Sequence, residues 1–155
     1  MIINFFSTIK SKFYGKEKIN YHKYSKFPNI EVKDFIPSFD KFIDSVDEID
    51  IAFGHLNPIH DAHLVLPSKA MESMARGKVT IHTYDSKLKD YIDSFGYSPS
   101  MIFYKDTVED LKNQILKINN NPDLKKEIGN NARKLILEKF NVTKKNNEFF
   151  NFLTN

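Results

Sequence analysis

Residues 50–84, DIAFGHLNPIHDAHLVLPSKAMESMARGKVTIHTY, decide the fold of this chain. Residues 50–54 form a short apolar run closed by a glycine, and residues 68–76 repeat apolar side chains at helical spacing. Gly77 then occupies the position where a left-handed helix cap is favoured, and residues 78–84 are rich in Val, Ile and Thr. A strand, a loop, a helix and a second strand in this order are typical of a βαβ unit with parallel strands.

The same alternation continues on both sides of this unit. Before it, residues 30–35 predict a strand, and Ser38 caps a predicted helix whose apolar face carries Phe39, Phe42, Ile43 and Val46. After it, the pattern predicts a helix over 86–95 that buries Leu88, Tyr91 and Ile92, followed by a strand over 101–104. Three helices come next: one capped by Thr107, a longer one opened by Asn121 and Pro122, and a last one over 143–153 capped by Asn141. The sequence therefore predicts an α/β fold, a Rossmann-like parallel sheet with helices on both faces.

Composition narrows the class of protein. A length of 155 residues suits a single domain, and the absence of Cys excludes disulfides and thiolate metal sites. The net charge is only +3 and the two signs are interspersed, which argues against nucleic acid as a partner. No run is long and apolar enough to span a bilayer and no secretory signal is apparent, so we expect a cytoplasmic protein.

The first 28 residues are assigned separately, as a partial N-terminal strand and helix. Residues 1–6 predict a strand and residues 7–24 a helical return. The alternative for residues 5–14 is a helix on a membrane surface, because Phe and Lys alternate there at roughly helical spacing. That alternative adds peripheral association with the inner face of the membrane to the expected cytoplasmic location.

The candidate chemistry lies where the predicted helix over 68–76 begins. Free N–H groups at Ser68, Lys69 and Ala70, the helix dipole and the charge of Lys69 together suit a phosphate group. Glu72 lies one turn further on, where a carboxylate can accept hydrogen bonds from two sugar hydroxyls. The alternative for Glu72 is that an acid in the first turn only complements the helix dipole.

The loop before this helix carries His55, His60 and His63 together with Asp61. Imidazole and carboxylate are ligands that suit a divalent transition metal, but the spacing of these residues matches no metal-binding pattern that we can justify. We therefore interpret them as side chains of a solvated loop that contact phosphate or sugar, and we expect no metal. His82, in the middle of a predicted strand, is interpreted as a core or rim histidine.

Residues 66–81, LPSKAMESMARGKVTI, resemble the signature of GT-B glycosyltransferases of the group 1, family 4-like type. That signature has a proline, a small residue, Lys, two apolar residues, Glu, a small or aromatic residue, Met-Ala, any residue and Gly-Lys before a strand. Further stretches resemble the family in the same order: residues 29–36, 50–53, 106–111 and 130–140. The resemblance thus covers residues 29–153, and residues 29–155 are identified as similar to the C-terminal, donor-binding domain of that family.

The resemblance implies a nucleotide-diphosphate sugar as donor substrate, with no further cofactor. It implies that Glu72 binds the ribose hydroxyls and that Pro67, Ser68 and Lys69 meet the diphosphate. The turn at Phe35 and Ile36 would lie against the base. The remaining implied contacts are donor-binding residues Gly54 and His55 and sugar-contacting residues His60, Asp61 and His63. The catalytic residue stays unassigned.

The sequence departs from the family in two respects. Leu64 stands where many relatives carry a Glu that contacts the donor sugar. The acceptor-binding N-terminal domain of the family does not fit before residue 29, so we expect a nucleotide-sugar-binding half that works with a separate N-terminal half. The alternatives are a non-catalytic Rossmann-like interaction subunit and a relic of a split glycosyltransferase gene. A receiver-like or flavodoxin-like domain is disfavoured, because receivers need clustered acids that residues 3–7 do not provide.

Overall fold

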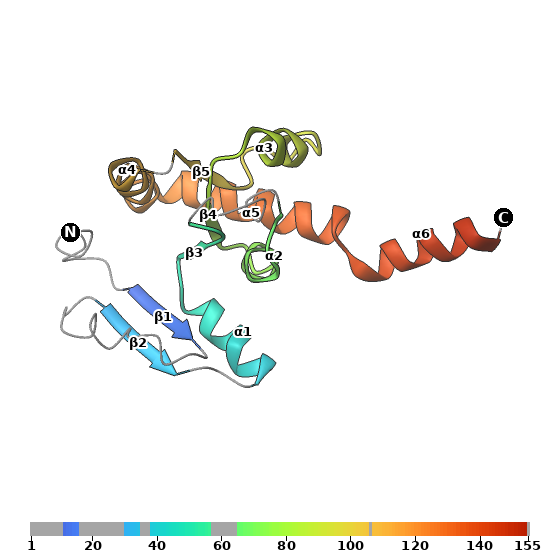
Figure 1. Ribbon diagram of the computed structural model, residues 1–155, viewed down its shortest axis with the longest axis horizontal. Coiled ribbons are helices and arrows are strands. Elements are labelled where there is room, and N and C mark those ends of the chain that lie inside the picture. The colour runs from blue at the N-terminus through green and yellow to red at the C-terminus, as the bar shows by residue number, and fades with distance from the viewer. Residues whose placement is uncertain (1–10, 16–29, 35–37, 57–64, 106, 155) are drawn as a thin grey trace. The chain divides into compact units, whose positions relative to one another are not determined.

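A computed structural model describes residues 11–15, 30–34, 38–56, 65–105 and 107–154 of the chain. The chain divides into two compact units, Met1–Glu48 and Ile49–Asn155, and Figure 1 shows the elements of each. The sequence interpretation instead takes a single domain with a partial segment before residue 29. The difference arises because the strands of the first unit pair with one another and form a sheet of their own.

The described residues of the first unit form two strands and a helix. Strands β1 (Ser11–Gly15) and β2 (Ile30–Asp34) pair in parallel, with Ser11 opposite Ile30 and Gly15 opposite Asp34. Helix α1 (Phe39–Asp47) follows Ser38, whose backbone is extended as in a helix cap but whose side chain makes no capping hydrogen bond. The predicted strand before Ser38 and the predicted helix after it are confirmed.

Residues 11–15 form strand β1 and not part of the helix predicted over residues 7–24 or of its membrane-surface alternative over 5–14, and the rest of both ranges lies outside the described residues. Phe13 and Tyr14 are aromatic residues with a preference for strands, and Gly15 disfavours continuation as a helix. The apolar pattern was too short to distinguish a helical period from a strand period, and pairing with β2 decides the matter. The strand predicted over residues 1–6 lies outside the described residues.

The second unit is built on a parallel sheet. Its strands are β3 (Ile51–Phe53), β4 (Val79–Thr83) and β5 (Ile102–Tyr104), in the order β3-β4-β5. Its helices are α2 (Ser68–Ala75), α3 (Ser86–Asp93), α4 (Val108–Asn119), α5 (Pro122–Lys139) and α6 (Val142–Thr154). The predicted α/β class is confirmed: helices flank a three-stranded parallel sheet, consistent with a Rossmann-like half-fold.

Apolar side chains cover both faces of this sheet, and every residue of β4 is buried. On one face, Ile51, Val79 and Ile102 pack with side chains from α4 and α5. The second cluster joins α2, α3 and the later part of α5 and includes Phe103; its buried members are Leu66, Ala70, Met74, Leu88, Ile92, Met101, Ala132, Leu135 and Ile136. The sheet is thus covered on both sides, as is usual for parallel strands, although β4 also buries the polar residues Thr80, His82 and Thr83.

Tyr91 is a correction to the predicted core, because its side chain is 53% exposed. Its ring lies edge-on to Phe95 and Phe140 at centroid distances of 5.0 and 6.4 Å. A tyrosine can cover apolar neighbours in this way while its hydroxyl stays in water.

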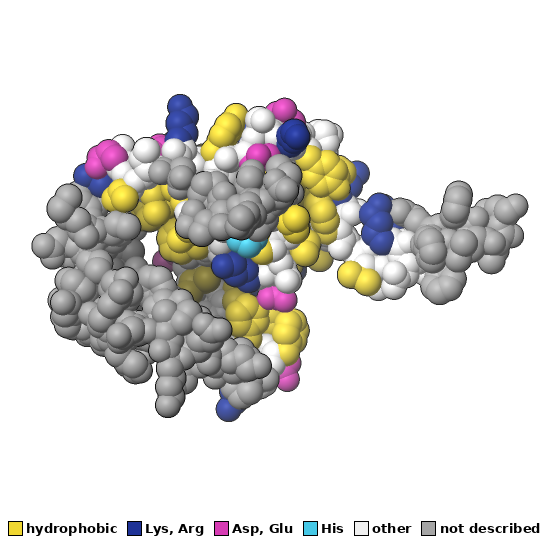
Figure 2. Space-filling model, in the orientation of Figure 1, with side chains coloured by type: hydrophobic (Ala, Val, Ile, Leu, Met, Phe, Trp, Pro, Cys, Tyr) yellow, Lys and Arg dark blue, Asp and Glu magenta, His cyan; other side chains and the backbone are white. Residues whose placement is uncertain are grey.

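The predicted helix caps of the second unit are confirmed. The side-chain oxygens of Thr107, Asn121 and Asn141 each accept a hydrogen bond from the backbone N–H three residues further on. Gly77 follows α2 with φ of 71°, the left-handed conformation expected of it. On the face drawn in Figure 2, basic and acidic side chains of the described residues are interspersed, as they are in the sequence.

Candidate functional site

The candidate site lies at the carboxyl edge of the β3-β4-β5 sheet, where α2 begins. Only three residues, 76–78, separate the end of α2 from the start of β4, so the helix must run back along the sheet, antiparallel to the strands. Its first turn is therefore at the same edge as Gly54 and His55, which follow β3 (Figure 1). Open parallel sheets commonly bind ligands at this edge.

The start of α2 presents two backbone donors rather than the three expected from the sequence. Pro67 is the N-cap, with extended φ and ψ of −69° and 149°, and its carbonyl oxygen accepts from Ala70 N at 2.9 Å and from Met71 N at 3.1 Å. The N–H of Ala70 is thus already bonded, which corrects the prediction that it is free. The N–H groups of Ser68 and Lys69 have no acceptor among the residues that the structure describes, and both residues are exposed.

One side of α2 is fixed in the core and the other carries the candidate binding groups. Ala70, Ser73 and Met74 are buried, and Ser73 Oγ donates a hydrogen bond to the carbonyl oxygen of Lys69 at 2.8 Å. Lys69 and Glu72 are three residues apart and therefore share a helix face. The exposed Lys69 and the half-buried Glu72 stand on a helix that packing holds in place.

The surroundings of this face disfavour both charges. Partial desolvation lowers the pKa of Lys69 below its usual value of 10.5 and raises the pKa of Glu72 above its usual value of 4.5. The ammonium and carboxylate forms are therefore each less stable here than in free solution. A ligand that brings an anion to Lys69 and hydroxyl donors to Glu72 would offset this partial loss of hydration.

The start of the loop after β3 is held by two residues that the sequence analysis did not single out, Thr83 and Tyr104. Thr83 donates to the carbonyl oxygen of His55 from its backbone N–H at 2.8 Å and from its hydroxyl at 3.0 Å. The hydroxyl of Tyr104 donates to the carbonyl oxygen of Leu56. Thr83 and Tyr104 are the last residues of β4 and β5, so their position at the carboxyl edge was the signal available in the sequence.

His82 explains why residue 54 is a glycine. His82 is fully buried, as the sequence analysis expects, and its Nδ1 donates to the carbonyl oxygen of Thr83 at 2.8 Å. A Cβ on Gly54 would lie only 2.5 Å from Cδ2 of the His82 ring. The His82 ring also contacts the His55 ring edge-on, with a centroid distance of 5.5 Å, so His82 packs against the beginning of the candidate loop.

Five predicted site residues lie outside the described residues: Phe35, Ile36, His60, Asp61 and His63. Within the described part of the chain, no group of His, Cys, Asp or Glu is arranged to hold a metal ion. Similarly, none of the described helices combines the length and apolar character needed to cross a bilayer.

Comparisons of the chain with protein-family models, with curated proteins and with solved structures find no match.

Proposed function

We propose that this chain is the nucleotide-sugar-binding half of a glycosyltransferase, with the donor held at the start of α2. The observation that carries the proposal is the pair of N–H groups of the exposed residues Ser68 and Lys69, which have no acceptor among the described residues, next to the Lys69 ammonium at the carboxyl edge of a parallel sheet. The resemblance of residues 66–81 to the GT-B signature supports the same choice of ligand.

The diphosphate of the donor is the group that suits the first turn of α2. Two backbone donors and the positive end of a helix dipole favour an anion at this position, and Lys69 adds a full charge. Because desolvation lowers the pKa of Lys69, an anion beside it would stabilise the ammonium more than it would in open water.

The ribose of the donor is the group that suits Glu72. An ionised carboxylate accepts hydrogen bonds and can bridge two neighbouring hydroxyls. Glu72 lies one turn beyond Lys69 on the same helix face, which matches a pentose attached to the phosphate bound at Lys69. Hydrogen bonds to a partly desolvated carboxylate are stronger than those to one in bulk water.

Sugar transfer needs a second half in this proposal. The acceptor must be held in line with the donor carbon in a cleft that excludes water, and most of the rate advantage comes from that positioning. One wall of a cleft binds the donor but positions no acceptor. We therefore expect the chain alone to bind nucleotide-sugars and to transfer sugar only together with an acceptor-binding partner.

Calorimetric titration of the chain with nucleoside diphosphates and their sugar conjugates tests this function. A dissociation constant of about 1 mM or tighter corresponds to about 4 kcal/mol, which a half-site can supply. Glu72→Ala should weaken binding of the nucleoside diphosphate but leave that of inorganic diphosphate unchanged, whereas Lys69→Met should weaken both.

The matched controls are Glu127→Ala and Lys126→Met, which remove the same charges from exposed positions on α5. Both should bind like the parent chain. Absence of binding to every nucleotide in the panel, with the chain shown to be folded, would reject the proposal and leave the non-catalytic subunit as the better description.

A further inference from the structure

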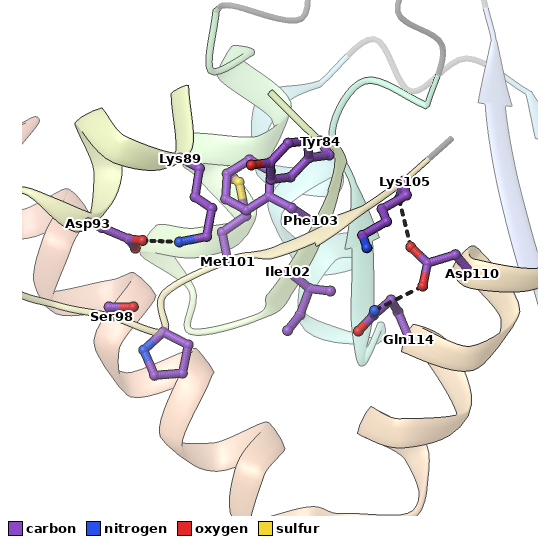
Figure 3. A pocket seen from close by; sticks show the side chains of 11 residues that line it. Tyr84, Lys89, Asp93, Ser98, Met101, Ile102, Phe103, Lys105, Asp110 and Gln114 are labelled. Atoms are coloured by element: carbon purple, nitrogen blue, oxygen red, sulfur yellow. Dashed lines mark hydrogen bonds and ion pairs between the residues drawn. The ribbon is translucent and has the colours of Figure 1, made fainter. Parts of the chain in front are cut away.

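A pocket of about 390 Å³ lies beside β5, and Figure 3 shows the side chains that line it. Three consecutive residues line it: Met101, Ile102 and Phe103. Ile102 and Phe103 are successive residues of β5 whose side chains point to opposite faces of the sheet, so a cavity that touches both must lie beside the strand. In the order β3-β4-β5, that side of β5 has no neighbouring strand among the described residues. We call this pocket the edge slot.

Helices from both faces of the sheet form the walls of the edge slot. Lys89 and Asp93 of α3 stand on one side, and Asp110 and Gln114 of α4 stand on the other. Asp93 lies near one end of the slot and Lys105 near the opposite end (Figure 3). The slot thus lies beside the edge strand, between α3 on one face of the sheet and α4 on the other. One more strand paired with β5 would fill this space.

The backbone of β5 offers hydrogen bonds to this slot. The carbonyl oxygen of Tyr104 accepts from Tyr84 N at 2.8 Å, so Tyr104 faces β4. By the alternation of a strand, the backbone groups of Phe103 and Lys105 face the slot. Lys105 N donates to Asp110 Oδ2 at 2.6 Å, and this carboxylate oxygen occupies the place of a carbonyl from a neighbouring strand. By the same alternation, the N–H and C=O of Phe103, the central residue of β5, point away from β4 and into the slot.

We propose that the edge slot receives β5 of a second copy of this chain, antiparallel to the first, about a two-fold axis that passes beside Phe103 normal to the sheet. The two Phe103 residues then exchange both N–H···O bonds, and the two sheets become one continuous sheet. Such an interface is self-complementary, as a two-fold axis requires. The inference is independent of the donor site.

The charges at the two ends of the slot favour this occupant over an unrelated peptide. Lys105 and Phe103 are two residues apart and share the sheet face that α3 covers. An axis normal to the sheet keeps that face in common and brings Lys105 of one copy to the end of the slot where Asp93 of the other lies. Lys105 is exposed and its ammonium makes no ion pair with a carboxylate of the described residues, whereas Asp93 pairs with Lys89 of its own helix.

Sedimentation of the full chain over a range of concentrations tests the proposal. We expect a reversible dimer whose dissociation constant rises about tenfold or more in Lys105→Glu, because two attractive contacts become repulsive. The double variant Lys105→Glu with Asp93→Lys restores opposite charges across the interface and should return most of the affinity. Lys117→Glu makes the same change of charge at an exposed site on α4 outside the slot and should leave the dimer unaffected.

A chain that stays monomeric at all concentrations overturns the proposal, and so does a dimer that is indifferent to the charge at residue 105. Failure of the charge swap to recover affinity would also count against it. These readouts do not involve nucleotides, so they stand or fall separately from the proposed donor site.

Crosslinking gives a second and direct measurement, because the chain contains no cysteine. Residues that face one another in a hydrogen-bonded antiparallel pair have Cα atoms about 5.5 Å apart, within reach of a disulfide. Phe103→Cys should therefore form a covalent dimer under mild oxidation, much faster than Leu137→Cys, which places a thiol at an exposed site on α5. Equal rates for the two variants would contradict pairing at β5.

Discussion

Gly129 of α5 faces the carbonyl oxygen of Gly77 so closely that a Cβ on Gly129 would lie 2.2 Å from that oxygen. The backbone of α5 therefore rests directly on the turn between α2 and β4. Arg133, one turn further along α5, donates from Nη1 to the carbonyl oxygen of Ala75 at 2.7 Å. Two contacts from α5 thus fix the end of the helix whose beginning forms the candidate site.

Replacing Gly129 with Ala should destabilise the chain strongly. The added methyl group would overlap backbone, which cannot rotate away, so α5 or the turn must shift. We expect a loss of about 2–4 kcal/mol in the free energy of unfolding, measured by urea denaturation. Asn130→Ala, at an exposed position of the same helix, is the control and should change stability by less than about 0.5 kcal/mol. An unchanged unfolding midpoint in Gly129→Ala would mean that the close approach is absent in solution.

Gly77 should respond to substitution for a different reason. Its φ of 71° is strained for residues with a side chain, whereas a Cβ there would only touch Gly129 O at 3.6 Å. Gly77→Ala should therefore cost about 1–2 kcal/mol from backbone strain alone. Gly77→Asn should cost less, because Asn tolerates the left-handed conformation best after Gly. Equal losses for Ala and Asn in urea denaturation would indicate a steric cause instead.

These two glycines show where sequence-based prediction succeeds and where it stops. Gly77 was predicted because a helix end followed by Gly is a local pattern. Gly129 lies inside α5, and nothing in its neighbours along the chain reveals that another turn of backbone approaches it. Local patterns therefore predicted the order of strands and helices after residue 29, but not the contacts that hold them together.

The candidate site divides in the same way. The start of α2 followed from Pro67, Ser68 and the apolar spacing behind them. The hydrogen bond from Ala70 N to Pro67 O could not be predicted from the sequence, because the geometry of the first turn varies between helices that share a sequence pattern. The sequence places Thr83 and Tyr104 at the ends of two strands, but their hydrogen bonds to the loop after β3 depend on pairing between strands that are distant in sequence, which the sequence does not reveal.

Removing the hydroxyl of Tyr104 should loosen the start of the candidate loop. In Tyr104→Phe the carbonyl oxygen of Leu56 loses its bond to a buried hydroxyl, at a cost of about 1 kcal/mol in unfolding free energy. The larger effect should be local: faster hydrogen exchange at residues 55 and 56, measured by mass spectrometry. Tyr84→Phe removes an exposed hydroxyl and serves as the control. Unaltered exchange at the loop in Tyr104→Phe would show that this anchor is dispensable.

The charges of Lys69 and Glu72 should lower the free energy of unfolding of the free chain, although they contribute to binding of the ligand. The raised pKa of Glu72 means that its favourable contribution to folding exists below the unfolded pKa and is lost as the pH rises through the folded pKa. Glu72→Gln should therefore be slightly more stable than the parent chain at pH 7 and equally stable under acid conditions below the pKa of free Glu. The gain should be less than about 1 kcal/mol, because Glu72 is only half-buried and solvent screens the effect.

Lys69 should behave in the opposite sense along the pH scale. Its lowered pKa gives a contribution to folding that exists above the unfolded pKa and is lost as the pH falls through the folded pKa. Lys69→Met should thus gain a little stability at pH 7, and the gain should disappear in alkaline solution.

Urea unfolding of both variants from acid to alkaline pH, together with calorimetric titration by a nucleoside diphosphate, measures the effects on stability and on binding. Higher stability combined with weaker binding is the pattern expected of groups that a ligand stabilises. Lower stability of Lys69→Met at pH 7 would instead show that the ammonium supports the fold, and it would remove the electrostatic argument for an anion at the start of α2.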